Sequence, residues 1–134
     1  MKKLLLLSIL NFSFLLLNCF SQQQNHFTHF TIDDGLSQSS VFSIVQDDFG
    51  FMWFATEDGL NKFDGNKFTT FRPKENDTTS IPDFGIRKIY KDKSGKLWVL
   101  TLRGKLCRYN PQKNNFTQYS FNTDKQNIAI KIIT

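Results

Sequence analysis

The sequence predicts an all-β chain made of β-propeller blades, on three observations. The 15 Phe residues mostly alternate with polar neighbours, and this alternation favours β-strands. The segment 44–56 recurs as the segment 89–101, because Trp98 follows Trp53 by 98 − 53 = 45 residues. Units of roughly 40–50 residues that each carry a glycine and a tryptophan mark are typical of the four-stranded blades of a propeller.

Residues 1–21 are predicted to be a signal peptide. Lys2 and Lys3 form a basic start, an apolar run covers residues 4–17, and polar residues follow from Gln22. The apolar run is shorter than the roughly 20 residues that a membrane-spanning helix needs, which disfavours the alternative of a retained anchor. Cys19 raises lipid attachment as a second alternative, disfavoured because Asn18 stands where a small residue is needed. We therefore expect an exported, periplasmic chain.

The mature part, residues 22–134, is predicted to be a partial propeller that begins with a leading strand at 27–31. Phe27-Thr28-His29-Phe30 has the same form as Phe68-Thr69-Thr70-Phe71, which ends the first repeat. In many propellers the N-terminal strand completes the last blade and so closes the ring. A lone copy of the outer strand ahead of the first repeat is what that arrangement requires.

Blade one is predicted to span 36–72 as four antiparallel strands. The innermost strand alternates apolar and polar residues over 41–46, and the second strand covers 51–56. A short third strand follows at 60–63, and the Asp64-Gly65 pair favours a tight hairpin before the outer strand at 68–72.

Blade two is predicted at 82–121, and the apolar run near the C-terminus is interpreted as the start of blade three at 126–134. One extra residue enters the second copy after Gly104, so that Tyr109 corresponds to Phe63. The second copy also departs from the first at one turn, where 102–105 stands in place of 57–60. Two blades cannot close a ring that usually needs four to eight, so the chain is interpreted as a fragment.

Ten residues form the motif that recurs in both copies of the repeat, and they are predicted to be structural. The aspartates are expected to form the turn before each tryptophan, the glycines to occupy turns, and the tryptophans to fill the core between blades. These residues are Asp47, Gly50, Trp53, Thr56, Gly59, Asp92, Gly95, Trp98, Thr101 and Gly104.

The order of these residue types resembles the two-component regulator propeller repeat, and in particular the opening blade of periplasmic sensors of hybrid two-component systems. The residues that carry the resemblance are Gly35-Leu36-Ser37-Gln38, Gly50-Phe51-Met52-Trp53-Phe54, Asp58-Gly59-Leu60 and Phe63-Asp64-Gly65. The resemblance implies further propeller repeats, an immunoglobulin-like domain, a transmembrane helix and a histidine kinase, or less often a diguanylate cyclase. It also implies oligosaccharide signals and a dimeric full-length sensor.

The sequence shows no catalytic, metal or cofactor site. No arrangement of serine, histidine and acid stands out, and His26 and His29 have no third ligand nearby. Cys107 is expected to be a small core residue, because one thiol without a placed base specifies no chemistry. The formal net charge of +5 falls to +3 when Lys2 and Lys3 leave, and the basic residues are scattered, which argues against nucleic-acid binding.

We therefore expect the N-terminal part of a ligand-sensing propeller that has no enzymatic activity of its own and whose partners are the remaining blades. Candidate ligand contacts are the loop residues Phe49, Glu57, Asp58 and Arg103, none of them singled out. The alternative is an exported interaction module whose two-blade chains assemble into a ring. An enzymatic propeller such as a lyase would need an acid–base set that these residues do not show.

Overall fold

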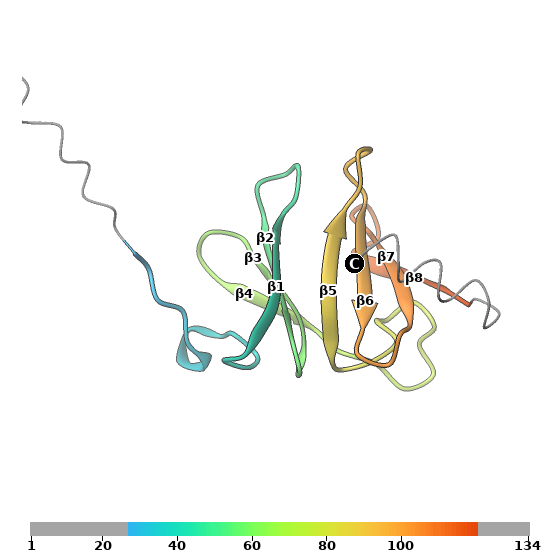
Figure 1. Cartoon of the computed structure of the whole chain (residues 1–134), viewed down its shortest axis with the longest axis horizontal. Coiled ribbons are helices and arrows are strands. Elements are labelled where there is room, and N and C mark those ends of the chain that lie inside the picture. Colours follow the sequence, from blue (N-terminus) through green and yellow to red (C-terminus); the bar gives the residue numbers. More distant parts are fainter. Residues whose placement is uncertain (1–26, 121–134) are drawn as a thin grey trace, which may run out of the picture.

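The computed structural model describes residues 27–120, and within them the chain forms two four-stranded antiparallel sheets (Figure 1). The predicted signal peptide with Cys19, His26 and the predicted start of blade three lie outside the described residues. Blade one runs in the order β1 (Val41–Gln46), β2 (Met52–Thr56), β3 (Gly59–Phe63) and β4 (Phe68–Phe71). Blade two repeats this order in β5 (Ile86–Lys91), β6 (Leu97–Thr101), β7 (Leu106–Asn110) and β8 (Asn115–Tyr119). The predicted all-β blade architecture is therefore confirmed.

The two blades have the same internal irregularity. The pairing of β1 with β2 shifts by one residue between Val41 and Ser43, and the pairing of β5 with β6 shifts between Ile86 and Lys88. Such a bulge adds one residue to one strand and increases the local twist. Because the register shift recurs at equivalent positions, it belongs to the repeat and not to one blade.

The hydrophobic core lies between the two sheets. Trp53 of blade one is fully buried there, and its indole ring stacks on Phe71 at 5.7 Å and meets Tyr109 edge-on at 4.6 Å between ring centroids. Phe71 in turn packs edge-on against Phe116, at 5.3 Å. Blade two contributes the apolar side chains Ile86, Ile89, Leu97, Val99, Cys107, Tyr109 and Phe116 to the same cluster. Trp53 is thus core between blades.

Leading residues 27–31 form no strand among the described residues. A strand requires a neighbour to pair with, and the expected neighbour, the last blade of a closed ring, is not part of the described chain. A short 3-10 helix follows at Ile32–Asp34, where the Thr31 hydroxyl accepts from the Asp33 amide at 3.2 Å and the Asp34 carboxylate accepts from the Thr31 amide at 2.7 Å. This reciprocal cap ends the leading segment at a fixed point beside blade one.

Candidate functional site

The turns of the two blades gather at two opposite ends of the sheets. The Asp-turn end holds the turns 47–51 and 92–96, which meet because Lys91 Nζ binds Asp48 Oδ1 at 2.7 Å (upper part of Figure 1). The loop end holds the turns 57–58 and 102–105 together with the loop 73–85 between the blades, and the Leu102 amide donates there to the Gly85 carbonyl at 2.8 Å. Propellers bind ligands at such ends, so both ends are candidate sites.

At the Asp-turn end, the aspartate of each repeat holds its own turn and its own tryptophan. Asp47 Oδ1 accepts from the amides of Phe49 and Phe51, both at 3.0 Å, and Asp47 Oδ2 accepts from the Trp53 indole nitrogen at 2.7 Å. A single carboxylate thereby fixes the turn and aims the indole ring into the core.

Asp92 repeats this geometry in blade two. Its Oδ2 accepts from the Trp98 indole nitrogen at 2.8 Å, and its Oδ1 accepts from the amides of Ser94 and Lys96 at 2.8 and 3.0 Å. The Trp98 indole N–H and then the Ser94 hydroxyl hold the pKa of Asp92 well below its usual value. Sequence reasoning predicted a turn here but missed the bond to the indole, because that bond joins residues six apart across a hairpin.

The Asp-turn end also carries a contact between neighbouring blades that the repeat does not predict. The Asp48 carboxylate lies directly over Gly95, where φ is +78°, and a Cβ at Gly95 would collide with that carboxylate. Asp48 is at the same time paired with Lys91. The position equivalent to Asp48 in blade two is Lys93, since 48 + 45 = 93, so this contact is specific to the first junction.

Beside this contact, a cleft of about 360 Å³ opens between the two blades at the Asp-turn end. Asp48 and Phe49 line it from blade one, and Lys96, Asn110 and Gln112 line it from blade two. Phe49 is 71% exposed. The cleft is mixed in character, because charged, aromatic and amide side chains line it.

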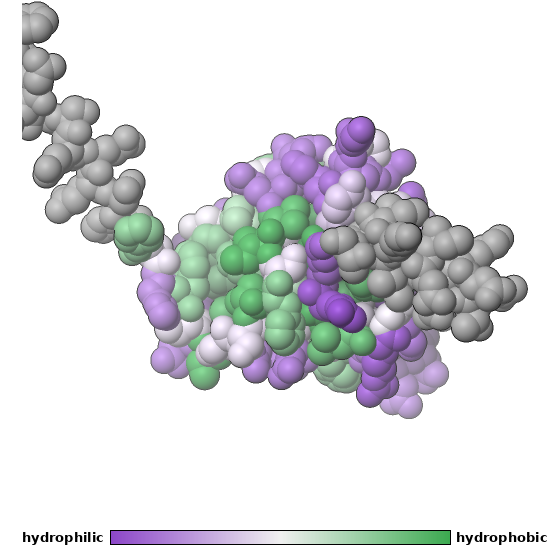
Figure 2. Space-filling model, in the orientation of Figure 1, coloured by the Kyte–Doolittle hydropathy of each residue, from purple (hydrophilic) through white to green (hydrophobic). Residues whose placement is uncertain are grey.

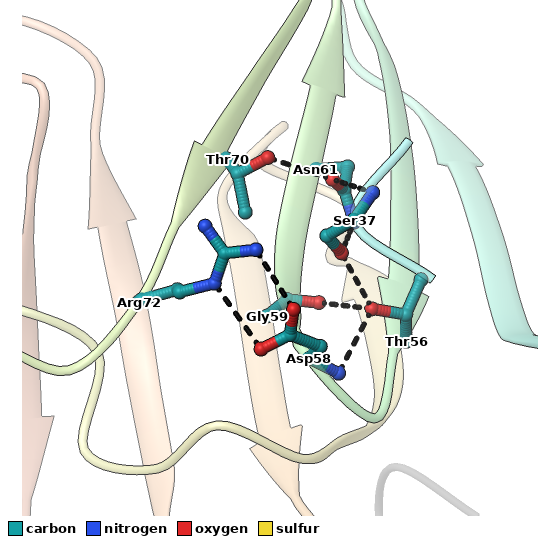
Figure 3. Close-up of polar contacts among 7 residues, drawn as sticks. All are labelled: Ser37, Thr56, Asp58, Gly59, Asn61, Thr70 and Arg72. Atoms are coloured by element: carbon teal, nitrogen blue, oxygen red, sulfur yellow. Dashed lines mark hydrogen bonds and ion pairs between the residues drawn. The ribbon is translucent and has the colours of Figure 1, made fainter. Parts of the chain in front are cut away.

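At the loop end of blade one, a buried polar cluster anchors the chain that leads into the blade (Figure 3). Asn61 is fully buried, and its Oδ1 accepts from the Ser37 amide and from the Thr70 hydroxyl, both at 3.0 Å. Its amide nitrogen donates to Ser37 Oγ at 2.7 Å, and Ser37 Oγ lies 2.9 Å from Thr56 Oγ1. Because the cluster satisfies its own hydrogen-bonding groups, it is a structural rather than a ligand-binding arrangement.

Next to this cluster, Asp58 and Arg72 form a paired contact on the surface. Arg72 donates from Nε and Nη2 to the two carboxylate oxygens of Asp58 at 3.2 and 2.8 Å (Figure 3). The Arg72 guanidinium lowers the pKa of the Asp58 carboxyl. Gly59 takes φ +118° in the same turn, and a Cβ there would lie 2.6 Å from the Phe71 carbonyl oxygen. Only glycine fits this approach of the turn to β4.

Blade two places a different group at the loop end. Asp83 has a side chain only 10% exposed, and its Oδ2 lies 3.6 Å from Nε of Arg103, which is 80% exposed. Asp83 Oδ1 accepts from the Phe84 amide at 3.0 Å, whereas the buried Oδ2 accepts no hydrogen bond from the described residues. Phe84 and Leu102, the chain neighbours of Asp83 and Arg103, are both exposed. The loop end thus brings a carboxylate and a guanidinium together, and an exposed aromatic residue follows the carboxylate in the chain.

The structure separates the four predicted ligand residues into two groups. Phe49 lies at the Asp-turn end, whereas Glu57, Asp58 and Arg103 lie at the loop end. Asp58 is occupied by Arg72, and Arg103 faces Asp83, a residue that sequence reasoning did not consider. No repeat pattern marks Asp83, because the loop 82–85 meets the turn 102–105 only through the fold.

The described residues contain no group of three or more His, Cys, Asp or Glu that could hold a metal ion. Burial raises the pKa of the Cys107 thiol to about 12, so the thiol stays protonated in the core at neutral pH. Within residues 27–120, no helix has the length and apolar character needed to cross a membrane.

The chain is similar to proteins of two-component systems. Residues 35–58 match the family model described as two component regulator propeller. Over 82 residues, or 60% of this chain, the sequence is 48% identical to "Histidine kinase P4" of Formosa agariphila, and the match spans 6% of the length of that protein.

Two solved structures from B. thetaiotaomicron are also similar. The extracellular domain of BT3049, named as a hybrid two component system, is 36% identical with a TM-score of 0.64; the match covers 74% of this chain and 14% of that one. The extracellular domain of BT4673, which is also named as a hybrid two component system, is 30% identical with a TM-score of 0.51. That match covers 59% of this chain and 11% of the other chain.

Proposed function

We propose that this chain, whose blades are of the two-component regulator propeller family, is part of the periplasmic ligand-sensing domain of a hybrid histidine kinase that responds to oligosaccharides. The observation that carries the proposal is the repeat itself. The Asp–Trp bond occurs in both blades, residues 35–58 match the family model, and the similar solved structures are extracellular domains of two-component systems.

The proposed role of this chain is binding and not catalysis. The carboxylates most suited to acid–base chemistry are engaged in the fold, Asp47 and Asp92 with the indoles and Asp58 with Arg72. The kinase activity is proposed for the remainder of the protein, together with dimerisation that couples the ligand to the kinase.

Within this chain, the Asp83–Arg103 pair at the loop end is the contact that best suits a saccharide. Sugar hydroxyls are recognised by fixed planar polar groups, and the apolar face of a sugar ring packs on an aromatic side chain. Asp83 Oδ2 accepts no hydrogen bond from the described residues, and the exposed Arg103 guanidinium has several N–H donors. Phe84, next to Asp83 in the chain, is 51% exposed. Loops of other blades are proposed to complete the site.

The test is a calorimetric titration of the sensor domain that contains this chain, with a panel of neutral and acidic oligosaccharides. We expect one saccharide class to bind, and we expect Arg103→Ala and Phe84→Ala each to weaken binding by roughly tenfold, or about 1.4 kcal/mol. Phe49→Ala at the opposite end is the matched control and leaves the affinity unchanged. Binding of no saccharide, with a response to another ligand class, would contradict the proposal.

A second candidate function is an exported module whose copies assemble into a ring. It is favoured by one observation, the exposed apolar face of blade one, where Ile44 is 53% exposed. Light scattering of the purified 134-residue chain separates the two candidates. A discrete closed oligomer supports the module, whereas a monomer supports the sensor fragment.

A further inference from the structure

The amine of Lys62 lies among aromatic rings where the two blades meet. Lys62 is half-buried on β3, directly opposite Trp53 of β2. Its Nζ lies 3.7 Å from the centroid of the Phe51 ring, 5.6 Å from that of Trp53 and 5.8 Å from that of Tyr109. A cation within about 6 Å of a ring centroid is attracted by the negative face of the ring. Because Tyr109 belongs to blade two, one lysine contacts both blades through its charge.

The rings, and not a carboxylate, compensate this cation. Taking an ammonium group out of water is costly unless it is paired. The ion pairs found within residues 27–120 do not include Lys62. The attraction that offsets its partial burial therefore comes from the rings of Phe51, Trp53 and Tyr109, here called the cation box.

The rings of the cation box are held by hydrogen bonds in which the lysine has no part. The Phe51 amide donates to Asp47 Oδ1 at 3.0 Å, and the Trp53 indole nitrogen donates to Asp47 Oδ2 at 2.7 Å. The Tyr109 hydroxyl donates to Asn114 Oδ1 at 2.7 Å. The box is thus preorganised, and we expect it to keep its shape when the lysine side chain is removed.

The cation box can be reached from solvent through the cleft at the Asp-turn end. Tyr109 of the box and Asp47, which holds the other two rings, both line that cleft. The surface of this end is largely hydrophilic (upper part of Figure 2). Burial and the nearby Asp47 carboxylate raise the pKa of Tyr109, which places a negative charge close to the box. A small cation entering the cleft therefore meets a carboxylate before it meets the rings.

The cation box does not belong to the repeat. The position of Phe51 is taken in blade two by Lys96, since 51 + 45 = 96, and that of Lys62 by Arg108, since 62 + 46 = 108. The Arg108 guanidinium lies over two rings of its own blade, at 5.8 and 6.0 Å. A box that joins three rings from two blades is therefore a feature of the first junction.

We propose that Phe51, Trp53 and Tyr109 form a binding site for an ammonium group between the blades, and that Lys62 fills this site from within the chain. The external ligand that the site takes, once the lysine amine leaves it, is a small primary alkylammonium ion. Such an ion carries the charge and the aliphatic stem of lysine. The site lies at the Asp-turn end and does not depend on the ligand proposed for the loop end.

Chemical rescue tests the site. Lys62→Ala removes the occupant, and we expect it to lower the thermal unfolding midpoint of the 134-residue chain by roughly 4–8 °C. The n-propylammonium ion has the chain of heavy atoms that the substitution removes. We therefore expect it to raise the midpoint of the variant again, increasingly with its concentration, relative to sodium chloride at the same ionic strength.

Propan-1-ol and Lys67→Ala are the matched controls. Propan-1-ol has nearly the same shape as the ammonium ion but no charge, and Lys67 is an exposed lysine of the neighbouring hairpin. We expect no rescue of Lys62→Ala by the alcohol and no change of the Lys67→Ala midpoint with the ammonium ion. Equal rescue by both compounds, or an equal response of both variants, overturns the proposed site.

A second measurement tests the occupancy in the unsubstituted chain by NMR. Protons above an aromatic ring are shifted upfield, so the ε-methylene protons of Lys62 should resonate upfield of those of the exposed lysines. Phe51→Leu removes the ring nearest the amine and should move the signal back. A Lys62 signal at the position of the exposed lysines in the unsubstituted chain overturns the assignment of Lys62 as the occupant.

Discussion

The face of blade one that carries Ile44 (the Ile44 face) and the equivalent face of blade two that carries Ile89 are built from the same pattern but meet different surroundings. Ile89 and Val99 are buried against blade one, whereas Ile44 is 53% exposed and its face receives the Phe30 ring, which packs on Phe63 and Phe68. The difference is set by the neighbour and not by the blade, because each sheet buries an apolar face only when another sheet packs on it. Each blade thus contains the complete strand pattern but supplies only one side of a core between blades.

The largest difference between the two faces is expected when each isoleucine is replaced by alanine. We expect Ile89→Ala to lower the free energy of unfolding by about 2–5 kcal/mol, because it leaves a cavity in the core between the blades. Ile44→Ala, at the equivalent exposed position, should stay within about 0.5 kcal/mol. Urea denaturation followed by circular dichroism measures both values.

Closure of the ring should then remove this asymmetry. In a sensor domain that contains the preceding blade, Ile44→Ala should cost as much as Ile89→Ala does here. If Ile44→Ala is already as damaging as Ile89→Ala in the 134-residue chain, the Ile44 face is not open and the comparison is wrong.

A smaller effect is expected at the turn of blade two and should depend on pH. The pKa of Asp92 is lowered in the folded chain, chiefly by the Trp98 indole, so its carboxylate stabilises the fold above the unfolded pKa of about 3.9. This stabilisation is lost as pH falls below about 4 towards the lower folded pKa. Unfolding midpoints measured between pH 7 and acid should therefore fall less steeply for Asp92→Asn than for the wild type.

The exposed Asp33→Asn is a matched control for this titration, because it removes one carboxylate outside the tryptophan turns. An Asp92→Asn variant whose acid dependence equals that of the wild type would show that the indole bond does not stabilise the folded carboxylate.

The smallest effect is expected for the Asp58–Arg72 pair, which blade two lacks. The equivalents there are Arg103, since 58 + 45 = 103, and Ser120, since 72 + 48 = 120. Both side chains of the pair are almost half exposed, so Arg72→Ala should cost roughly 0.2–1 kcal/mol. The loss should shrink in high salt, measured as a difference in unfolding midpoint at low and high ionic strength. A cost that does not change with salt would mean that packing of the Arg72 stem, not the charge, matters.

Much of the fold could be predicted from the sequence because the same strand and turn residues recur in both copies of the repeat. Alternation predicts the strands, and Asp64-Gly65 predicts the hairpin. Trp53 marks the side of blade one that enters the core, whereas blade two enters it with Leu97 and Val99, on the side opposite Trp98. The leading segment was predicted as a strand from its likeness to 68–71, but pairing needs a neighbour that these residues do not supply. Its contact with blade one could not be predicted, because it depends on packing between sheets.

The candidate site was less predictable than the fold. The turn positions of four residues predicted ligand contacts, and the structure divides these residues between two ends: Phe49 at one, and Glu57, Asp58 and Arg103 at the other. Asp83 was missed because its importance rests on burial and on a residue 20 positions away, since 103 − 83 = 20. Residues that act through a repeat are visible in one sequence, whereas residues that act through a single junction are not.

The contact of Asp48 with Gly95 and Lys91 bears on how such proteins evolve. Repeats that arise by gene duplication begin as interchangeable copies, and recombination between them can add, delete or reorder blades. At this junction the copies have diverged in a complementary way, since Asp48 needs a glycine and a lysine on the following blade and Lys93 replaces it in the next copy. A chain in which the two blades were exchanged would place Lys93 against Gly50 and Gln46, so the ion pair would be lost. The junction therefore favours the present order of the two blades.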